Sequence, residues 1–257
     1  MIAKEFRAMR WNLLAGLAIL ALITAQLLAA DLHTVDLQAV SDQTDASLTA
    51  ITNGQIPVGA AFIWAGYFST TLYFLVGLGG ALFGAGLIAS ETSSGTALLL
   101  LSRPISRERI LLIKYGVAAL GLLILSVLCG ALALFLGALG GVRQPPLGGV
   151  LLSVALLWLA ELFVMGVALV YSVLFPTAIA AGVLGFFTSY AIVIAPTFHN
   201  GMNQYYLGGP DWSLATYWST LDIYAGGGDP VKALLVSLGV ALIPLVIATL
   251  LFARKAF

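Results

Sequence analysis

Six long apolar runs alternate with more polar segments along the chain. The runs lie near residues 11–30, 62–89, 110–139, 148–174, 177–197 and 231–252. An apolar helix of about 20 residues crosses the roughly 30 Å hydrocarbon layer, and lipid offers no partner to backbone polar groups outside helices or closed barrels. The pattern predicts an all-α membrane protein with six transmembrane helices, forming a single transmembrane domain over residues 1–257.

Composition leads to the same class of protein. Hydrophobic residues make up 61% of the chain and charged residues 9%, against about 45–50% and about 25% in soluble domains. The net charge is zero, and no basic run is interleaved with aromatic residues, so no nucleic-acid partner is expected. The single cysteine, Cys129, lies in an apolar run, which excludes an internal disulfide and favours a packed thiol.

Basic residues predict the orientation of the chain, because Lys and Arg are retained on the cytoplasmic side of a membrane. With a cytoplasmic N-terminus, nine of the eleven fall inside and two, Arg143 and Lys232, fall outside. The nine are Lys4, Arg7, Arg10, Arg103, Arg107, Arg109, Lys114, Arg254 and Lys255. We therefore expect both termini in the cytoplasm. Residues 11–30 form a longer apolar stretch than a signal-peptide core and are interpreted as a retained span.

Residues 1–10 have the pattern of a helix lying in the membrane surface. Ile2, Phe6 and Met9 share one helical face, and basic residues occupy the remainder. Such an N-terminal amphipathic interfacial helix can meet anionic lipid headgroups while its apolar stripe dips into the acyl boundary. Plain topological anchoring is the alternative.

The segment 91–109 mixes apolar and polar chemistry in a cytoplasmic connection. Ser93, Ser94 and Gly95 are suited to start a short helix, and Arg103 with Pro104 ends it. Ser106 can cap the next span, with Glu108 in its first turn. Between them stand four consecutive leucines, Leu98, Leu99, Leu100 and Leu101. Left in water these would be a liability, so we expect them to dock into a partner's groove; a corner packed on its own spans is the alternative.

The order of residues in this segment resembles the signature of type-2 ABC transporter permeases, also described as the type V or ABCG-like exporter fold. The matching positions are Glu91, Gly95, Thr96, Leu98 to Leu101, Ser102, Arg103, Pro104, Ser106, Arg107 and Lys114. In that family the segment between spans two and three is the coupling helix that contacts the nucleotide-binding subunit. The surface helix before span one and the six-span plan also match.

The resemblance implies a partner and roles for these residues. Glu91 and the segment from Arg103 through Arg107 to Arg109 would make polar contacts with a separate ABC ATPase subunit, and the four leucines would fill its groove. ATP and Mg²⁺ would be bound by that subunit, since this chain has no GxxxxGK[ST] phosphate loop. The chain itself would be a non-catalytic permease with no cofactor, working as an exporter by alternating access in the plasma (inner) membrane. A second permease copy or a paralogue would supply the other half of the pathway. No residue selects a substrate.

Glu161 stands near the middle of the fourth predicted span. A charged group there costs roughly 2.5–3.5 kcal/mol on insertion scales, so it is usually turned toward protein or water. It is a candidate pathway residue or proton relay, or else a protonated carboxyl hydrogen-bonded to a neighbouring helix. Thr188, Ser189 and Tyr190 in the fifth span are candidate partners.

Two further features have alternative interpretations. The glycine cluster 77–86 includes Gly80 and Gly84 at the spacing that allows close helix approach, which would serve either local packing or a dimer seam. The predicted outer loop 198–230 is rich in Tyr and Trp, which suits an interfacial belt or a substrate gate.

Three other function classes compete with the permease. An intramembrane enzyme needs a nucleophile, base or metal at one depth, and the sequence offers no HExxH motif or paired intramembrane aspartates. A membrane scaffold or receptor would need no ATPase partner. A stand-alone secondary transporter is supported by Glu161 alone.

Overall fold

The structure, a computed structural model, describes residues 73–95, 106–139, 147–206, 214–218 and 229–254. Every regular element in these ranges is an α-helix. The helices are α4 (Tyr73–Ser93), α6 (Arg107–Leu139), α7 (Leu147–Leu174), α8 (Ala178–Tyr206), α9 (Leu214–Trp218) and α11 (Pro230–Arg254). The predicted interfacial helix 1–10, the first span 11–30 and the start of the second span lie outside the described residues.

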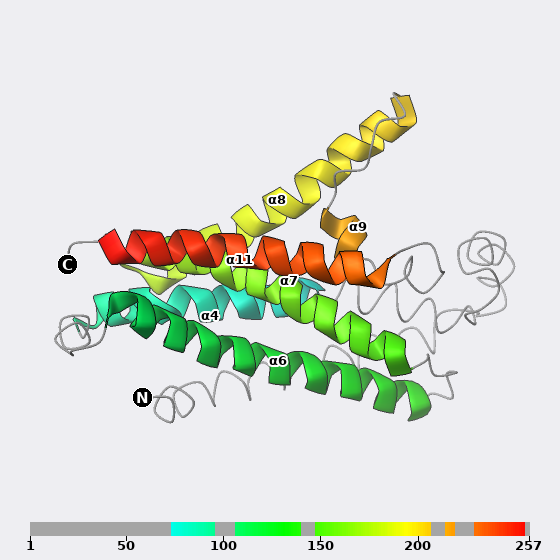
Figure 1. Ribbon diagram of the computed structural model, residues 1–257, viewed down its shortest axis with the longest axis horizontal. Coiled ribbons are helices and arrows are strands. Elements are labelled where there is room, and N and C mark those ends of the chain that lie inside the picture. Colours follow the sequence, from blue (N-terminus) through cyan, green and yellow to red (C-terminus); the bar gives the residue numbers. More distant parts are fainter. Residues whose placement is uncertain (1–72, 96–105, 140–146, 207–213, 219–228, 255–257) are drawn as a thin grey trace, which may run out of the picture.

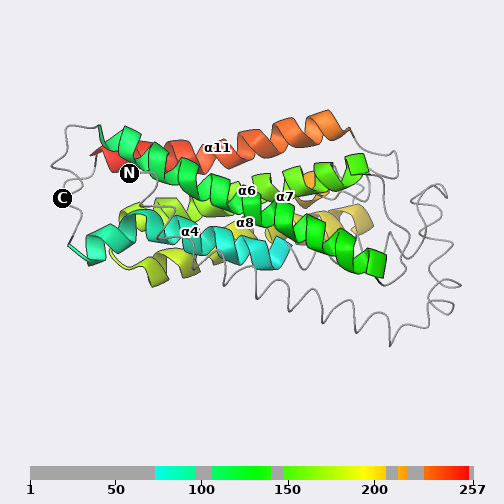
Figure 2. The same ribbon diagram turned by 90° about the horizontal axis from the view of Figure 1, so that it is seen from below.

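The long helices form a bundle around α7. Helices α4, α6, α7 and α11 run side by side, whereas α8 diverges from the others along its length (Figures 1 and 2). The C-terminus of α4, the N-terminus of α6 and the C-terminus of α11 share one end of the bundle (Figure 1). Within the described residues, α7, α11 and the stretch Arg107–Leu132 of α6 are long and apolar enough to cross a membrane. The all-helical membrane architecture is therefore confirmed, while the number of six spans stays a prediction.

Hydropathy placed most of the described helix ends to within a few residues. Predicted spans 110–139, 148–174 and 231–252 correspond to α6, α7 and α11. Helix α8 continues beyond the predicted span 177–197 to Tyr206, into what was expected to be a loop. An apolar pattern reports the part of a helix that suits lipid, and the last turns of α8 carry His199, Asn200, Asn203 and Gln204.

Local chemistry explains where the helices start. Pro176 follows α7 at the turn into α8, and the Thr177 carbonyl accepts the Ala181 N–H at 3.2 Å. At α11, the Asp229 carboxylate accepts the N–H groups of Val231 and Lys232 at 2.9 and 3.3 Å, and Pro230 takes the first helical position. The Asp229 carboxylate thereby satisfies N–H groups that have no intrahelical partner, and the Thr177 bond is the first i to i+4 bond of α8.

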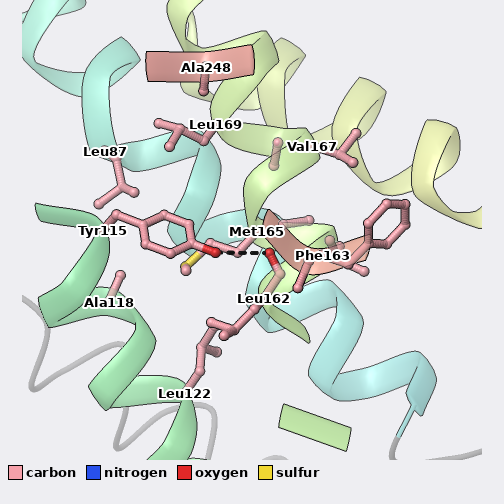
Figure 3. Packing of buried hydrophobic residues seen from close by; sticks show 14 of the residues in the cluster. Leu87, Tyr115, Ala118, Leu122, Leu162, Phe163, Met165, Val167, Leu169 and Ala248 are labelled. Carbon is pink, nitrogen blue, oxygen red and sulfur yellow. Dashed lines mark hydrogen bonds between the residues drawn. The ribbon is translucent and has the colours of Figure 1, made fainter. Parts of the chain in front are cut away.

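Burial is concentrated on α7 and apolar exposure on the outer helices. Leu169, Met165 and Val164 of α7 are at most 1% exposed, and Figure 3 shows Leu162, Phe163, Met165 and Leu169 packed among side chains of α4, α6 and α11. On α11, by contrast, several large apolar side chains point away from the bundle. Leu235, for example, is 64% exposed. An apolar exterior over a packed centre suits a bundle surrounded by lipid.

Glycines bring α4 and α8 into contact with the backbone of α7. A Cβ on Gly84 would lie 2.2 Å from the Met165 carbonyl oxygen, and one on Gly185 would lie 2.5 Å from the Ala168 Cα. A Cβ on Gly80 would lie 2.9 Å from the carbonyl oxygen of Glu161. Gly80 and Gly84 therefore serve packing within this chain, and they are not free to form a seam with a second copy.

Gly84→Ala is expected to destabilise the protein by about 1–3 kcal/mol, because the added methyl would overlap a backbone carbonyl that cannot rotate away. Gly79→Ala is the matched control, since a Cβ there meets nothing within 4 Å. Thermal unfolding in detergent, followed by size-exclusion chromatography with fluorescence detection, compares the two variants. Equal melting temperatures would show that α4 does not approach α7 this closely.

Candidate functional site

The C-terminal turn of α4 is rich in hydroxyl groups that bind its own backbone. Ser90 donates to the Gly86 carbonyl, Thr92 to the Ile88 carbonyl at 3.2 Å, and Ser94 to the Ser90 carbonyl at 2.8 Å. Gly95 follows with a φ of +71°, a left-handed conformation that ends helices. The sequence favoured Ser93, Ser94 and Gly95 as the start of a short helix; in the structure Ser93 is the last residue of α4, and Ser94 and Gly95 form the turn that follows. The short helix itself would lie in residues 96–105, outside the described residues, and stays a prediction.

An ion pair joins this turn to α6. The Lys114 ammonium lies 2.9 Å from a carboxylate oxygen of Glu91. The Lys114 side chain is 4% exposed and that of Glu91 is 24% exposed, so the pair lies at the edge of the packed bundle. A buried ammonium needs such a partner, because leaving it unpaired is costly. Glu91 and Lys114 thereby hold together the two helices that flank residues 96–105.

The start of α6 agrees with its predicted cap. The Ser106 side chain accepts the Arg109 N–H at 3.4 Å, and the Ser106 carbonyl accepts the Ile110 N–H at 3.1 Å. Glu108 stands in the first turn, where a negative charge is favourable to the helix dipole. Arg109 is exposed and Arg107 is partly exposed next to this cap.

The described residues contain part of the predicted coupling segment. Glu91 lies in the last turn of α4 and Gly95 in the turn that follows it, and Arg107 and Arg109 lie in the first turn of α6. Thr96, Leu98, Leu99, Leu100, Leu101, Arg103 and Pro104 lie outside the described residues. Their docking into a partner's groove stays a prediction.

Lys114 is the residue of this site to which the sequence assigned no role. Its position was part of the family signature, but its contact with Glu91 was not foreseen. The available signal was a lone cation in an apolar helix, which calls for an acidic partner. Glu91, at the end of the preceding predicted span, was the nearest acid in sequence on the other side of the connection.

Glu161 is enclosed by helices of its own chain. It is 1% exposed, and both carboxyl oxygens lie 3.0 Å from the Ser126 hydroxyl of α6. That hydroxyl also lies 2.8 Å from the Leu122 carbonyl. The expected partners on α8 have other contacts: Thr188 bonds to Tyr171 at 2.9 Å, and Ser189 donates to the Gly185 carbonyl at 2.7 Å. The polar contact of Glu161 is therefore with α6 rather than with α8.

Two further side chains fasten α6 to α7. Trp158 donates its indole N–H to the Ala119 carbonyl at 2.9 Å, and Tyr115 donates its hydroxyl to the Leu162 carbonyl at 3.2 Å (Figure 3). Together with the Ser126–Glu161 contact, these bonds are spread over several turns of α6, from Tyr115 to Ser126. Helices α6 and α7 are thus linked by hydrogen bonds as well as by packing.

At the opposite end of the bundle, α9 places one aromatic residue of the predicted outer loop against the helices. Trp218 is 9% exposed, donates to the Ser237 hydroxyl at 3.0 Å and lies 6.0 Å, centroid to centroid, from the ring of Phe163. Tyr217 lies 5.8 Å from the Lys232 ammonium. Trp218 therefore packs against α7 and α11.

The fold and this site together define a helical integral membrane protein with a charged connection between two of its helices. A family model described as the ABC-2 family transporter protein matches residues 1–257. The chain belongs to this family and is a type-2 ABC transporter permease, the membrane component of an ABC transporter. No curated protein matches the chain.

Glu91→Gln is expected to lower the thermal stability of the protein, because it removes the carboxylate that pairs with the buried Lys114 ammonium; breaking a buried pair costs about 3–5 kcal/mol and less near a surface. The double variant Glu91→Gln with Lys114→Met should recover much of this loss. A double-mutant cycle of melting temperatures measures the coupling. Additive losses would mean that the two side chains do not interact.

Ser126→Ala is expected to cost about 1–3 kcal/mol of stability, since it removes the hydrogen-bond partner of a buried carboxyl. Ser189→Ala is the control: it deletes an equally buried hydroxyl whose bond is to its own helix. Chemical denaturation in detergent compares the two. Similar losses in both variants would contradict the pairing of Ser126 with Glu161.

Proposed function

We propose that the chain is the membrane-spanning subunit of an ATP-driven exporter, and that segment 91–109 receives the movement of a separate ABC ATPase subunit. The observation that carries this proposal is the Glu91–Lys114 ion pair, which fixes the two flanks of the segment to each other. A force applied to a connection is passed on efficiently when both of its ends are anchored. ATP and Mg²⁺ bind to the partner subunit.

The contact with the ATPase divides between apolar and charged residues. Leu98, Leu99, Leu100 and Leu101 fill a groove of the partner, while Arg103, Arg107 and Arg109 make polar contacts around it. The exposure of Arg109 and of Glu108 beside the helix cap supports this arrangement, because exposed charges are available to a partner. Gly95 and Pro104 bound the inserted part, and Thr96 lies within it.

Closure of the ATPase around ATP moves this segment and the helices that continue from it. The movement reaches α4 through Glu91 and α6 through Lys114 and the Ser106 cap. It reaches α7 through the Trp158, Tyr115 and Ser126 contacts described above. Helices tied in this way move as rigid bodies, as alternating access requires.

The remaining features of the transporter complete the proposal. The chain lies in the plasma (inner) membrane with both termini in the cytoplasm, and residues 1–10 lie on the lipid surface. A second permease copy or a paralogue forms the other half of the pathway. Glu161 is the candidate pathway residue, although the described helices enclose its carboxyl in this state, so exposure to a substrate would need a rearrangement of α6 and α7.

The proposal is tested by purifying the tagged chain from its native membrane in mild detergent and identifying its partners by mass spectrometry. A stoichiometric subunit that carries a phosphate loop is expected. Arg107→Glu combined with Arg109→Glu should weaken the binding of this subunit to the chain. Each 1.4 kcal/mol of contact energy lost raises the dissociation constant about tenfold. This pair of substitutions spares Glu91 and Lys114.

Arg254→Glu is the matched control, because it reverses an exposed charge at the end of α11, in a different part of the sequence. It should leave the association unchanged. Repeated absence of an ATPase from the wild-type preparation would contradict the proposed function and favour a stand-alone secondary transporter or a membrane scaffold. Unchanged association in the Arg107 and Arg109 variant would remove these residues from the interface.

A further inference from the structure

One hydroxyl group of α7 is bonded entirely to the backbone of α4. The Ser172 side chain is 0% exposed and lies near the end of α7 that meets the C-terminal turns of α4. Its oxygen accepts the N–H groups of Ile88 at 3.1 Å and Ala89 at 2.8 Å, and it donates to the Ala85 carbonyl at 2.7 Å. A hydroxyl has one hydrogen and two lone pairs, so the hydrogen-bonding capacity of Ser172 is fully used.

Other buried or partly buried hydroxyls in the bundle behave differently. Ser189, Ser237 and Thr249 each donate to the carbonyl four residues earlier in their own helix, at 2.7–2.8 Å. This local bond is the default for Ser and Thr within a helix. Ser172 makes no such bond among the described residues, since its donor is used for α4.

The bonded atoms are part of the hydrogen-bond ladder of α4. In a regular α-helix the N–H of Ala89 would donate to the carbonyl of Ala85, and here the Ser172 oxygen contacts both groups. A side chain that enters the ladder is a recognised cause of helix bending. The contact therefore acts on the direction of the helix and not only on its distance from α7.

Glu91 follows two residues after this contact. The last turns of α4 are thus held from two sides: by Ser172 of α7 on the backbone, and by Lys114 of α6 on the Glu91 carboxylate. The close approach of Gly84 to Met165 brings α4 near enough for the short Ser172 side chain to reach its backbone.

We propose that Ser172 is a positioning residue for the coupling segment: its hydroxyl sets the direction in which the Glu91 turn leaves the bundle, and it passes movement of that turn directly to α7. This inference rests on the proposed function for its consequence in transport. The local geometry can be tested without any partner.

The first test measures distances by double electron–electron resonance on the full chain in nanodiscs. Cys129, the single native cysteine, is replaced by Ala, and spin labels are attached at exposed positions. One pair joins Ser93, beyond the Ser172 contact, to Leu235 on α11; the other joins Leu78, before the contact, to Leu235. In Ser172→Ala the Ser93 distance is expected to shift by about 2 Å, the size of typical helix shifts, while the Leu78 distance stays the same.

Two variants control for other effects. Ser189→Ala removes an equally buried serine hydroxyl that bonds to its own helix, and it should move neither distance. Ser172→Thr keeps the hydroxyl, so its Ser93 distance should stay close to that of the wild type. This measurement can be made even where Ser172→Ala fails to fold. An unshifted Ser93 distance in Ser172→Ala, a displaced one in Ser172→Thr, or equal shifts at Ser93 and Leu78 would overturn the proposal.

The second test uses the complex with the co-purifying ATPase. Ser172→Ala should keep the subunit bound but reduce the rate of ATP hydrolysis by about fivefold or more, the lower range of typical coupling between sites. Ser189→Ala should hydrolyse ATP at the wild-type rate. A wild-type rate in Ser172→Ala would overturn the coupling role. If no ATPase is found with the wild type, the proposed function fails, while the distance measurements still decide the role of Ser172.

Discussion

The close approach of helix backbones to α7 is the constraint on which the rest of the structure depends. In lipid, helices gain little from burying apolar surface against each other, so small residues and polar contacts decide how they associate. Gly84 and Gly185 both approach the α7 segment around Met165 and Ala168, and neither site has room for a Cβ. Short polar side chains such as Ser172 can reach a neighbouring backbone only because the glycines permit this distance.

Polar groups then give the packed helices a fixed register. Trp158, Tyr115 and Ser126 fasten α6 to α7, Ser172 fastens α7 to α4, and Glu91 with Lys114 closes the connection between α4 and α6. Each bond satisfies a group that water cannot reach or reaches poorly, so its loss is costly. A membrane component that must move in response to a partner gains from such links, because a displacement at one end is carried along whole helices.

The agreement between sequence and structure differs from feature to feature for identifiable reasons. The expected bounds of α6, α7 and α11 lie within a few residues of those observed, because each of these helices is apolar over almost its whole length. Ser93–Gly95 were expected at a helix start and lie at the end of α4, since the same small polar residues suit both positions and the positive φ of Gly95 is typical of a helix end. The length of α8 was underestimated because its helix outlasts its apolar pattern.

Contacts between helices were the part that the sequence left open. The hydrogen-bond partner of Glu161 was expected on α8 and lies on α6. The sequence assigned no role to Lys114 or Ser172. Which faces meet depends on the rotation and depth of each helix, and these follow from packing across the whole bundle. The sequence by itself determined the membrane-embedded helical class, the Ser106 cap and the resemblance to a permease family, because these depend on composition and on residues close together in the chain. The tertiary structure decided which glycines face α7 and which side chains link α4, α6 and α7, because these contacts join residues far apart in sequence.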